Sequence, residues 1–255
     1  LDVVAQLGGG LRPALLEVGD QALEVELDVA QMGARDVIAL AGVPGLGGIA
    51  VTAQSVTIGA MVRHADVAAN DEVRQAIPAL AELAGGIGDP HVRNRGTLGG
   101  SVANNDPAAD YPAAVLGLGA TVNTDRRTIS ADDFFQGLFT TALEEGEIIT
   151  AIEFPVPKRA AYIKLPHPAS RYCLVSVMVS EGPKGTRVAV SGAGQEGVFR
   201  VPAMEAALAK SFTADALQGI KVPPDNLMTD IHAAADYRAH LIGVLARRAV
   251  AKAVA

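Results

Sequence analysis

Residues 96–110 of this chain, GTLGGSVANNDPAAD, join two adjacent glycines to a dense run of short polar side chains. Gly99 and Gly100 lack Cβ atoms, so another group can approach their backbone amides closely, and the hydroxyls of Thr97 and Ser101 add donors beside them. Amides and hydroxyls grouped in this way are typical of a phosphate site. The stretch therefore predicts a loop that holds the diphosphate of a nucleotide.

The polar residues after the glycine pair extend this candidate site. Asn104, Asn105 and Asp106 are short side chains of the kind that contact a ribose or tighten a turn. Asp110 can accept a hydrogen bond from a ribose hydroxyl or an adenine amino group. A long turn without a ligand has the same composition, so the residues alone leave both interpretations open. The sequence has no GxxxxGK(S/T) motif and no GxGxxG motif between a strand and a helix, which excludes a P-loop and a Rossmann phosphate site.

The composition narrows the classes of function. The 255 residues suffice for one or two domains, and a net charge of −7 without a basic stripe argues against nucleic-acid binding. Cys173 is the only cysteine, so the chain alone holds no disulfide, zinc site or iron-sulfur cluster, and we expect a buried, inert thiol. No apolar run reaches the roughly 18 to 20 residues that cross a bilayer, and no signal peptide is evident. We therefore expect a cytoplasmic protein.

Hydrophobic spacing and turn residues predict mixed helices and strands. Pro155 and Pro157 predict a domain boundary, because two prolines in three residues do not fit a central strand. We expect strands at residues 36–40, 51–59, 147–154, 161–165, 174–180 and 187–191, helices at 63–83 with a break at Pro78, 133–138, 204–209 and 236–254, and a glycine-rich loop at 84–100.

A longer segment around the glycine pair, GDPHVRNRGTLGGSVANNDPAADYP at residues 88–112, resembles the second flavin-binding loop in the FAD subunits of molybdenum hydroxylases. This family includes bacterial carbon monoxide dehydrogenase and the flavin domain of xanthine dehydrogenase. The resemblance extends to IGAMVRHADV (58–67), LGATV, ADDFF and EIITAIEFP, and to YIKLPHPASRYCLVSV (162–177) and HAAADYRAHLIGVLARRAV (232–250).

The resemblance implies an α+β fold in two domains. Residues 1–157 would form a two-part FAD-binding domain of the PCMH or vanillyl-alcohol-oxidase type, with a small α/β unit and a mixed sheet. Residues 158–255 would form a smaller α+β C-terminal domain.

The resemblance also assigns cofactor-binding residues. Thr97, Gly99, Gly100 and Ser101 would contact the FAD diphosphate, Asn104 and Asp106 would lie along the ribose and ribityl chain, and Asp110 would bind the adenosine end. Ile149 would pack near the flavin or adenine, with buried strand core as the alternative. Lys164 would lie near the isoalloxazine carbonyls, with a solvated strand lysine as the alternative.

The N-terminus departs from the family pattern. The family has a first diphosphate loop of the type AGG(Q/H)SLxP, and the nearest match here is LGGGLRP at residues 7–13, which keeps the glycines and the proline but lacks the serine. Gly8, Gly9 and Gly10 are the corresponding candidate ligands.

The family's activity implies a division of labour among subunits. FAD on this chain would accept electrons from [2Fe-2S] clusters on a small subunit, fed by a molybdopterin-binding large subunit, and pass them to an external acceptor. The expected assembly is a dimer of heterotrimers, and no residue of this chain is expected to be catalytic. The alternatives are a stand-alone FAD-dependent oxidoreductase and a nucleotide-binding scaffold subunit without redox activity.

Overall fold

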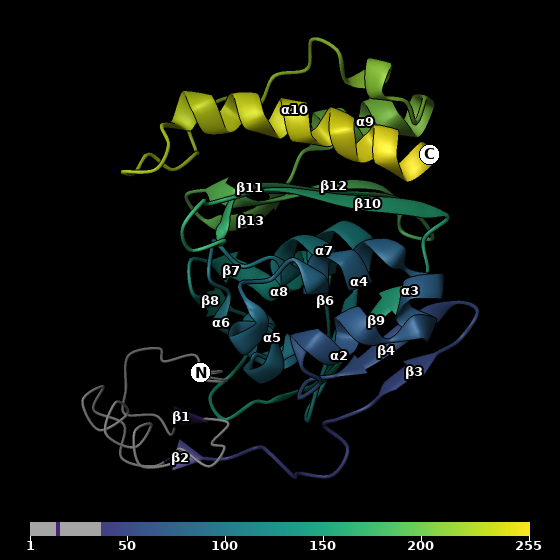
Figure 1. Ribbon diagram of the computed structural model, residues 1–255, viewed down its shortest axis with the longest axis vertical. Coiled ribbons are helices and arrows are strands. Elements are labelled where there is room, and N and C mark those ends of the chain that lie inside the picture. The colour runs from purple at the N-terminus through teal and green to yellow at the C-terminus, as the bar shows by residue number, and fades with distance from the viewer. Residues whose placement is uncertain (1–13, 16–36) are drawn as a thin grey trace.

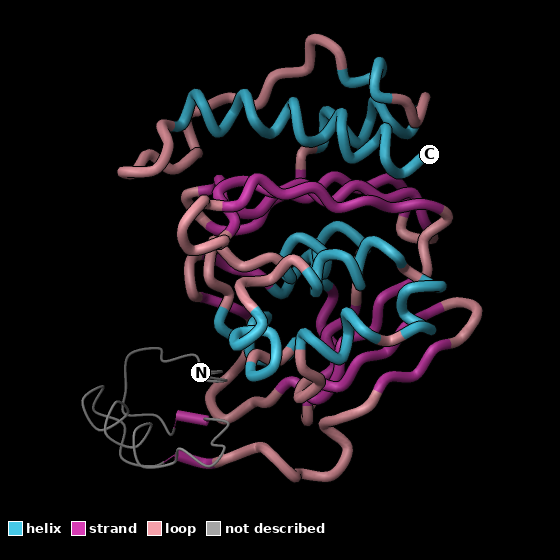
Figure 2. The backbone as a smooth tube through the Cα atoms, viewed as in Figure 1, coloured by secondary structure: helices cyan, strands magenta, loops and turns pink. Residues whose placement is uncertain are grey.

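The computed structural model of this chain describes residues 14–15 and 37–255, so the predicted ligands Gly8, Gly9 and Gly10 lie outside the described residues. The described elements stack in layers along the long axis of the molecule (Figure 1). Two helices at the C-terminal end cover a four-stranded sheet, a layer of helices lies beneath that sheet, and a five-stranded sheet follows (Figure 2). A short parallel pair, β1 (Ala14–Leu15) and β2 (Val37–Ile38), stands apart from both sheets, and β2 falls within the predicted strand at 36–40.

The four-stranded sheet is antiparallel throughout, in the order β10 (Arg159–Pro166), β11 (Cys173–Gly182), β12 (Gly185–Gly194) and β13 (Gly197–Arg200). A tight hairpin pairs Gly182 with Gly185. The predicted strands 161–165, 174–180 and 187–191 are confirmed and prove longer. The strand β13 was not predicted, because its four residues carry too short a pattern.

Helices cover both faces of this sheet. On one side lie α9 (Pro202–Lys210) and α10 (Ala235–Val254), where the sequence predicted helices at 204–209 and 236–254. On the other side lie α7 (Tyr111–Leu118) and α4 (Pro78–Gly85) (Figure 1). Since neither face meets water, the middles of β11 and β12 are buried almost without interruption.

The five-stranded sheet is also antiparallel. Its order is β3 (Ile49–Val51), β4 (Ser55–Gly59), β9 (Ile149–Pro155), β5 (Thr121–Thr124) and β6 (Thr128–Ser130). The strand predicted at 147–154 is confirmed as β9. The single strand predicted at 51–59 is wrong, because the Thr52 hydroxyl accepts the backbone N–H of Ser55 at 2.9 Å and turns the chain into a hairpin.

The helical stretch at 63–83 divides more often than its apolar spacing predicts. The break at Pro78 is confirmed, but a second break at Asn70 separates α2 (His64–Ala69) from α3 (Asp71–Ala76). Asn70 accepts the backbone N–H of Val73 at 2.8 Å and so begins the new helix.

The predicted glycine-rich loop at 84–100 is wrong, because it contains α5 (Pro90–Arg95) and the start of α6 (Leu98–Asn104). Asp89 and Thr97 cap these helices by accepting the backbone N–H groups of Val92 and Gly100. The high glycine content predicted a loop, but two side-chain caps are enough to begin short helices here.

The helix predicted at 133–138 starts nearly as expected but ends early. Residues Ala131–Phe134 form α8, and the chain then continues as a hairpin of β7 (Phe135–Gly137) and β8 (Thr140–Thr141). A 3-10 turn, η1 (Ala214–Leu217), precedes α10.

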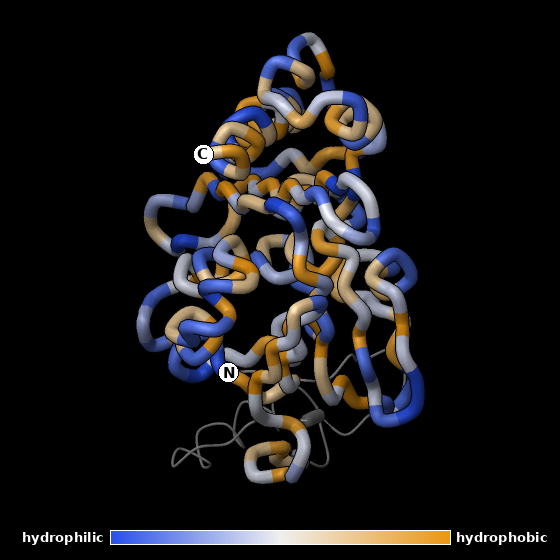
Figure 3. The backbone as a smooth tube through the Cα atoms, turned by 90° about the vertical axis from the view of Figure 1, so that its right-hand side faces the viewer, coloured by the Kyte–Doolittle hydropathy of each residue, from blue (hydrophilic) through white to orange (hydrophobic). Residues whose placement is uncertain are grey.

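Two hydrophobic clusters lie between the layers. Figure 3 shows hydrophobic stretches of the backbone within the sheets and hydrophilic stretches in several loops at the edge of the molecule. One cluster lies between the five-stranded sheet and the middle helices, and the other between the four-stranded sheet and α9 and α10. Met178 and Ala189 project from the four-stranded sheet into the first cluster, so the two clusters share that sheet. The architecture is a mixed α/β fold with antiparallel sheets, and a domain boundary at Pro157 stays a prediction. Within the described residues, no helix is long and apolar enough to span a membrane.

Candidate functional site

A cavity of about 370 Å³ lies where α6 and the turn after it meet the loop between β10 and β11. Five predicted site residues line it: Gly100, Ser101, Asn104, Asp106 and Asp110. The sequence did not single out the others with polar side chains, namely His64, Asp89, Ser170 and Tyr172. The predicted polar segment therefore does face a cavity large enough for part of a ligand.

The first turn of α6 is already hydrogen-bonded within the protein. The Gly99 amide donates to the carbonyl oxygen of Ala60 at 2.8 Å, and the Gly100 amide donates to the Thr97 hydroxyl at 3.2 Å. A Cβ at Gly99 would lie 2.5 Å from the Cβ of Ala60, so close packing against Ala60 requires this glycine. Among these residues, Gly100 and Ser101 line the cavity and Thr97 and Gly99 do not.

The turn at residues 105–110 is held by its own polar side chains. The Asn105 amide donates to the carbonyl oxygens of Gly137 and Thr140 at 2.7 and 3.0 Å, with its backbone in the left-handed region at φ 47°. Asp106 accepts the backbone N–H of Ala108 at 2.8 Å. Both side chains thus tighten the turn, one of the two roles that their composition predicted.

Asp110 is a buried carboxylate with two partners on β10. It accepts hydrogen bonds from the Tyr162 hydroxyl and from Lys164, whose Nζ lies 2.9 Å away. Burial raises the pKa of Asp110, and Lys164 and Tyr162 oppose that shift. The carboxylate, 4% exposed, still lines the cavity, so it can accept from a ligand as well.

Lys164 and Ile149 differ in their surroundings. The Lys164 side chain is 9% exposed and also donates to the carbonyl oxygen of Gly86 at 3.0 Å, so the solvated-lysine alternative is wrong. Ile149 is fully buried in the cluster next to the five-stranded sheet, as the strand-core alternative predicted. Contacts of either residue with a cofactor stay predictions.

His64 brings an uncharged imidazole to the cavity. The residue is 4% exposed, its ring lies 5.2 Å from that of Tyr111, and Nδ1 has no hydrogen-bond partner in the described part of the chain. Burial, aided by the charge of Arg93, lowers the pKa of His64 to about 4. A Cβ at Gly96 would lie 2.4 Å from Nε2, so a glycine is needed beside the ring.

The charges around this cavity favour hydrogen-bond donors. Asp89, Asp106 and Asp110 line it, whereas no lysine or arginine is among its described lining residues. Arg93 instead donates to the carbonyl oxygens of Ile87 and Gly88. An acidic lining suits ribose hydroxyls and ring N–H groups better than a diphosphate.

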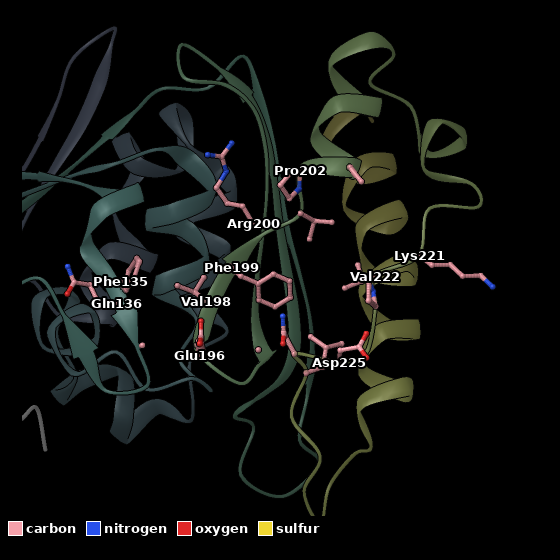
Figure 4. Close-up of a pocket in the computed structure, with 18 residues that line it drawn as sticks. Phe135, Gln136, Glu196, Val198, Phe199, Arg200, Pro202, Lys221, Val222 and Asp225 are labelled. Carbon is pink, nitrogen blue, oxygen red and sulfur yellow. The ribbon is translucent and has the colours of Figure 1, made fainter.

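A larger cavity of about 720 Å³ lies between β13, β7 and residues 221–227 (Figure 4). Its lining is mainly apolar, with the Phe199 ring facing the interior and Lys221 pointing away. It contains none of the predicted site residues. The described residues form no group of three or more histidine, cysteine or acidic side chains that could bind a metal.

Cys173 is a buried thiol, as predicted. Burial raises its pKa to about 12, so the thiolate is not formed near neutral pH.

Known proteins share this architecture and this segment. The family described as the FAD binding domain in molybdopterin dehydrogenase matches residues 7–157, more than half of the chain. The chain belongs to this family. The resemblance drawn from residues 88–112 is thereby confirmed, and FAD is the cofactor that the family description names.

Several relatives of this FAD-binding chain match over most of their length. The nicotine 6-hydroxylase medium subunit of Paenarthrobacter nicotinovorans is 35% identical over 240 residues, covering 85% of this chain and 81% of the relative. The carbon monoxide dehydrogenase medium chain of Hydrogenophaga pseudoflava is 31% identical over 268 residues, covering 98% of this chain and 92% of the relative. A solved structure of the latter organism's carbon monoxide dehydrogenase, lacking the Mo-pyranopterin moiety, aligns with a TM-score of 0.79 at 30% identity over 98% of this chain and 92% of that one.

The residues of this FAD-binding chain fit a flavin nucleotide at its polar, uncharged parts. Ser101 and Asn104 bring a hydroxyl and an amide to the cavity, Asp110 brings an acceptor, and His64 brings a buried nitrogen without a described partner. His64 was not predicted as a site residue, although it lies within IGAMVRHADV, part of the family resemblance.

Proposed function

We propose that this chain is the FAD-binding, electron-transferring subunit of a molybdenum-containing hydroxylase or dehydrogenase. The observation that carries the proposal is the cavity at α6, where Gly100, Ser101, Asn104 and Asp110 converge inside the segment that matches the FAD-binding family. When bound, FAD supplies reversible electron transfer, and the protein supplies binding and orientation.

The described side chains support distinct binding roles. Asp110, fixed by Tyr162 and Lys164, would accept from the adenosine end, Ser101 would contact the diphosphate, and Asn104 would lie along the ribose and ribityl chain. Lys164 is bonded to Asp110 at 2.9 Å, so both side chains would meet the same part of the cofactor. A contact of Lys164 with the isoalloxazine carbonyls would therefore replace, and not accompany, a contact of Asp110 with the adenosine end. Because the first amides of α6 are engaged and the cavity lining is acidic, diphosphate contacts by Thr97 and Gly99 require help from other segments, with Gly8, Gly9 and Gly10 as candidates.

Partner subunits would supply the remaining redox centres. One cysteine cannot provide the four thiolates that an iron-sulfur cluster usually requires. The names of the relatives, medium subunit and medium chain, support a multi-subunit setting. We propose a molybdopterin-binding large subunit and a [2Fe-2S] small subunit as partners, in a cytoplasmic dimer of heterotrimers.

Titration of the purified chain with FAD tests this proposal. We expect one FAD per chain, visible flavin absorbance, reduction by dithionite, and no oxidation of organic substrates by the single chain. Failure to bind FAD would refute the cofactor assignment. Substrate oxidation by a preparation free of molybdenum and iron would favour a stand-alone flavoenzyme.

A further inference from the structure

Arg238, on the C-terminal helix α10, is buried at 2% exposure. It lies near the turn at residues 106–110, which lines the cavity at α6 and is called the cofactor turn below. Its guanidinium donates to the carbonyl oxygens of Leu174, at 2.6 Å, and Gly192, and to the carboxylate of Asp230 at 2.7 Å. A guanidinium removed from water carries a large desolvation cost, which ordinary packing on a helix face does not require. Arg238 therefore holds a particular arrangement of the two strands.

The two strand segments that Arg238 holds also bind the cofactor turn. Gly192 donates its backbone N–H to the carbonyl oxygen of Pro107 at 2.9 Å, and Cys173, next to Leu174, donates to that of Ala108 at 3.3 Å. Gly192 has φ 82°, and a Cβ there would lie 2.8 Å from both the Cys173 sulfur and the Leu174 carbonyl oxygen. The ends of β11 and β12 are thus packed closely, with Arg238 on one side and the turn on the other.

The cofactor turn, residues 106–110, forms one wall of the cavity at α6. Asp106, Ala108, Ala109 and Asp110 all line it, and Pro107 lies between them. A displacement of the Cys173 and Gly192 amides would move this wall directly.

We propose that Arg238 is a positioning residue for FAD binding: it sets the turn at residues 106–110 through Leu174 and Gly192 without touching the cofactor. The inference rests on the proposed FAD site at α6. It gives the C-terminal helix a part in cofactor affinity, although that helix packs on the face of the four-stranded sheet opposite α4 and α7 (Figure 1).

Arg187 provides a matched control within the same sheet. Its side chain is 7% exposed, donates to the carbonyl oxygen of Leu116 at 2.9 Å, and pairs with Asp132 at 2.6 Å. Asp132 and Asp230 are similarly exposed, at 43% and 40%. Arg187 therefore has the same kinds of partners but contacts the end of α7 and not the cofactor turn.

The test compares Arg238→Met and Arg238→Lys with Arg187→Met and Arg187→Lys in the full chain. FAD dissociation constants are measured by flavin fluorescence at a temperature where each variant is folded, and amide hydrogen exchange is measured at Cys173 and Gly192 without FAD. We expect the Arg238 variants to weaken FAD binding about tenfold or more and to speed exchange at both amides, with the Lys variant milder because it keeps the charge but loses the forked donors.

The Arg187 variants should change FAD affinity less than about threefold, even where they lower the melting temperature as much as the Arg238 variants do. Equal losses of affinity in the two series, or unchanged exchange at Cys173 and Gly192 in folded Arg238→Lys, would overturn the proposal. If the unsubstituted chain itself binds no FAD, the proposed function fails, and with it the cofactor role of Arg238.

Discussion

Asp110 shows how one residue can serve both the fold and the site. Its carboxylate is buried, bonded to Tyr162 and Lys164 from a strand distant in sequence, and still lines the cavity. Only tertiary structure supplies those two partners, so the sequence could predict an acceptor at this position but not its support.

Replacement of Asp110 by alanine should weaken both properties. Tyr162 and Lys164 would lose their buried partner, which costs about 1 to 3 kcal/mol of unfolding free energy, and FAD affinity should fall about tenfold. Denaturant unfolding and FAD titration measure the two effects. An unchanged dissociation constant would leave Asp110 with a structural role alone.

His64 should make stability depend on pH. Its pKa is about 4 in the folded chain against 6.5 ordinarily, so acidification first protonates the unfolded state. The stabilising contribution of neutral His64 is complete above about pH 6.5 and is lost as the pH falls toward 4. By pH 4.5 this loss amounts to about 2 to 3 kcal/mol of unfolding free energy. The measurement is denaturant unfolding at several pH values, with His64→Gln as the control.

The comparison with His64→Gln isolates the imidazole, because other groups titrate in both proteins. A hydrogen bond from Arg127 lowers the pKa of Glu147 to about 2, so Glu147 titrates mainly below the pH range in which His64 acts. Parallel stability curves for the two proteins between about pH 7 and pH 4.5 would contradict the assignment of a neutral, buried His64.

Gly100 tests the position of the cofactor along α6. A valine there should project a branched side chain toward the cavity and deplete bound FAD, while the chain stays soluble. Gly243, a helical glycine on α10, is the control position for the same substitution, because an added Cβ there would come no closer than 3.7 Å to its nearest neighbour, the Arg247 side chain. Full flavin content in purified Gly100→Val would exclude cofactor contact at this turn.

At the scale of elements, short helices depend on their caps. Asn70 accepts the Val73 N–H at the start of α3, so Asn70→Ala should lower the unfolding free energy by about 1 kcal/mol and the melting temperature by about 2 to 4 °C. Asp71→Ala removes an exposed contact to Arg74 and one of two acids in the first turn of α3, and it should shift the melting temperature less than Asn70→Ala does. Calorimetry of both variants decides, and equal shifts would contradict a capping role for Asn70.

Elements with a long, regular pattern could be predicted from the sequence, and those set by single side chains could not. The strands around Val177 and Val190 and the C-terminal helix carry many apolar residues in period, so their existence followed directly. The hairpin at Thr52 and the helix that Thr97 begins each depend on the hydrogen bonds of a single side chain inside a glycine-rich or β-branched context.

The residues of the candidate site also fall into those that the sequence could predict and those that it could not. Ser101, Asn104 and Asp110 could be predicted because they are close together in one polar segment. His64 and Tyr172 could not, because each reaches the cavity from a different element through long-range packing. Arg238 could not either, because its partners Leu174 and Gly192 are distant from it in sequence. Asp132 lies in the first turn of α8 and also pairs with Arg187 and Arg200 across the layers, which only the tertiary structure shows.

At the scale of the whole molecule, the proposed function assigns the other redox centres to partner chains. The described residues offer the cavity at α6 but no metal-binding cluster, and the two relatives described above are named as a medium subunit and a medium chain. We therefore predict a complex in which this chain is reduced only through its partners.

The most direct measurement is the distribution of cofactors in the native complex. The chain, tagged at its C-terminus, is purified from its own cells, the subunits are separated under mild conditions, and FAD, molybdenum and iron are quantified in each fraction. We predict FAD with this chain, and molybdenum and iron only with the chains that accompany it. FAD on another subunit, or molybdenum or iron retained by this chain alone, would contradict the proposed role.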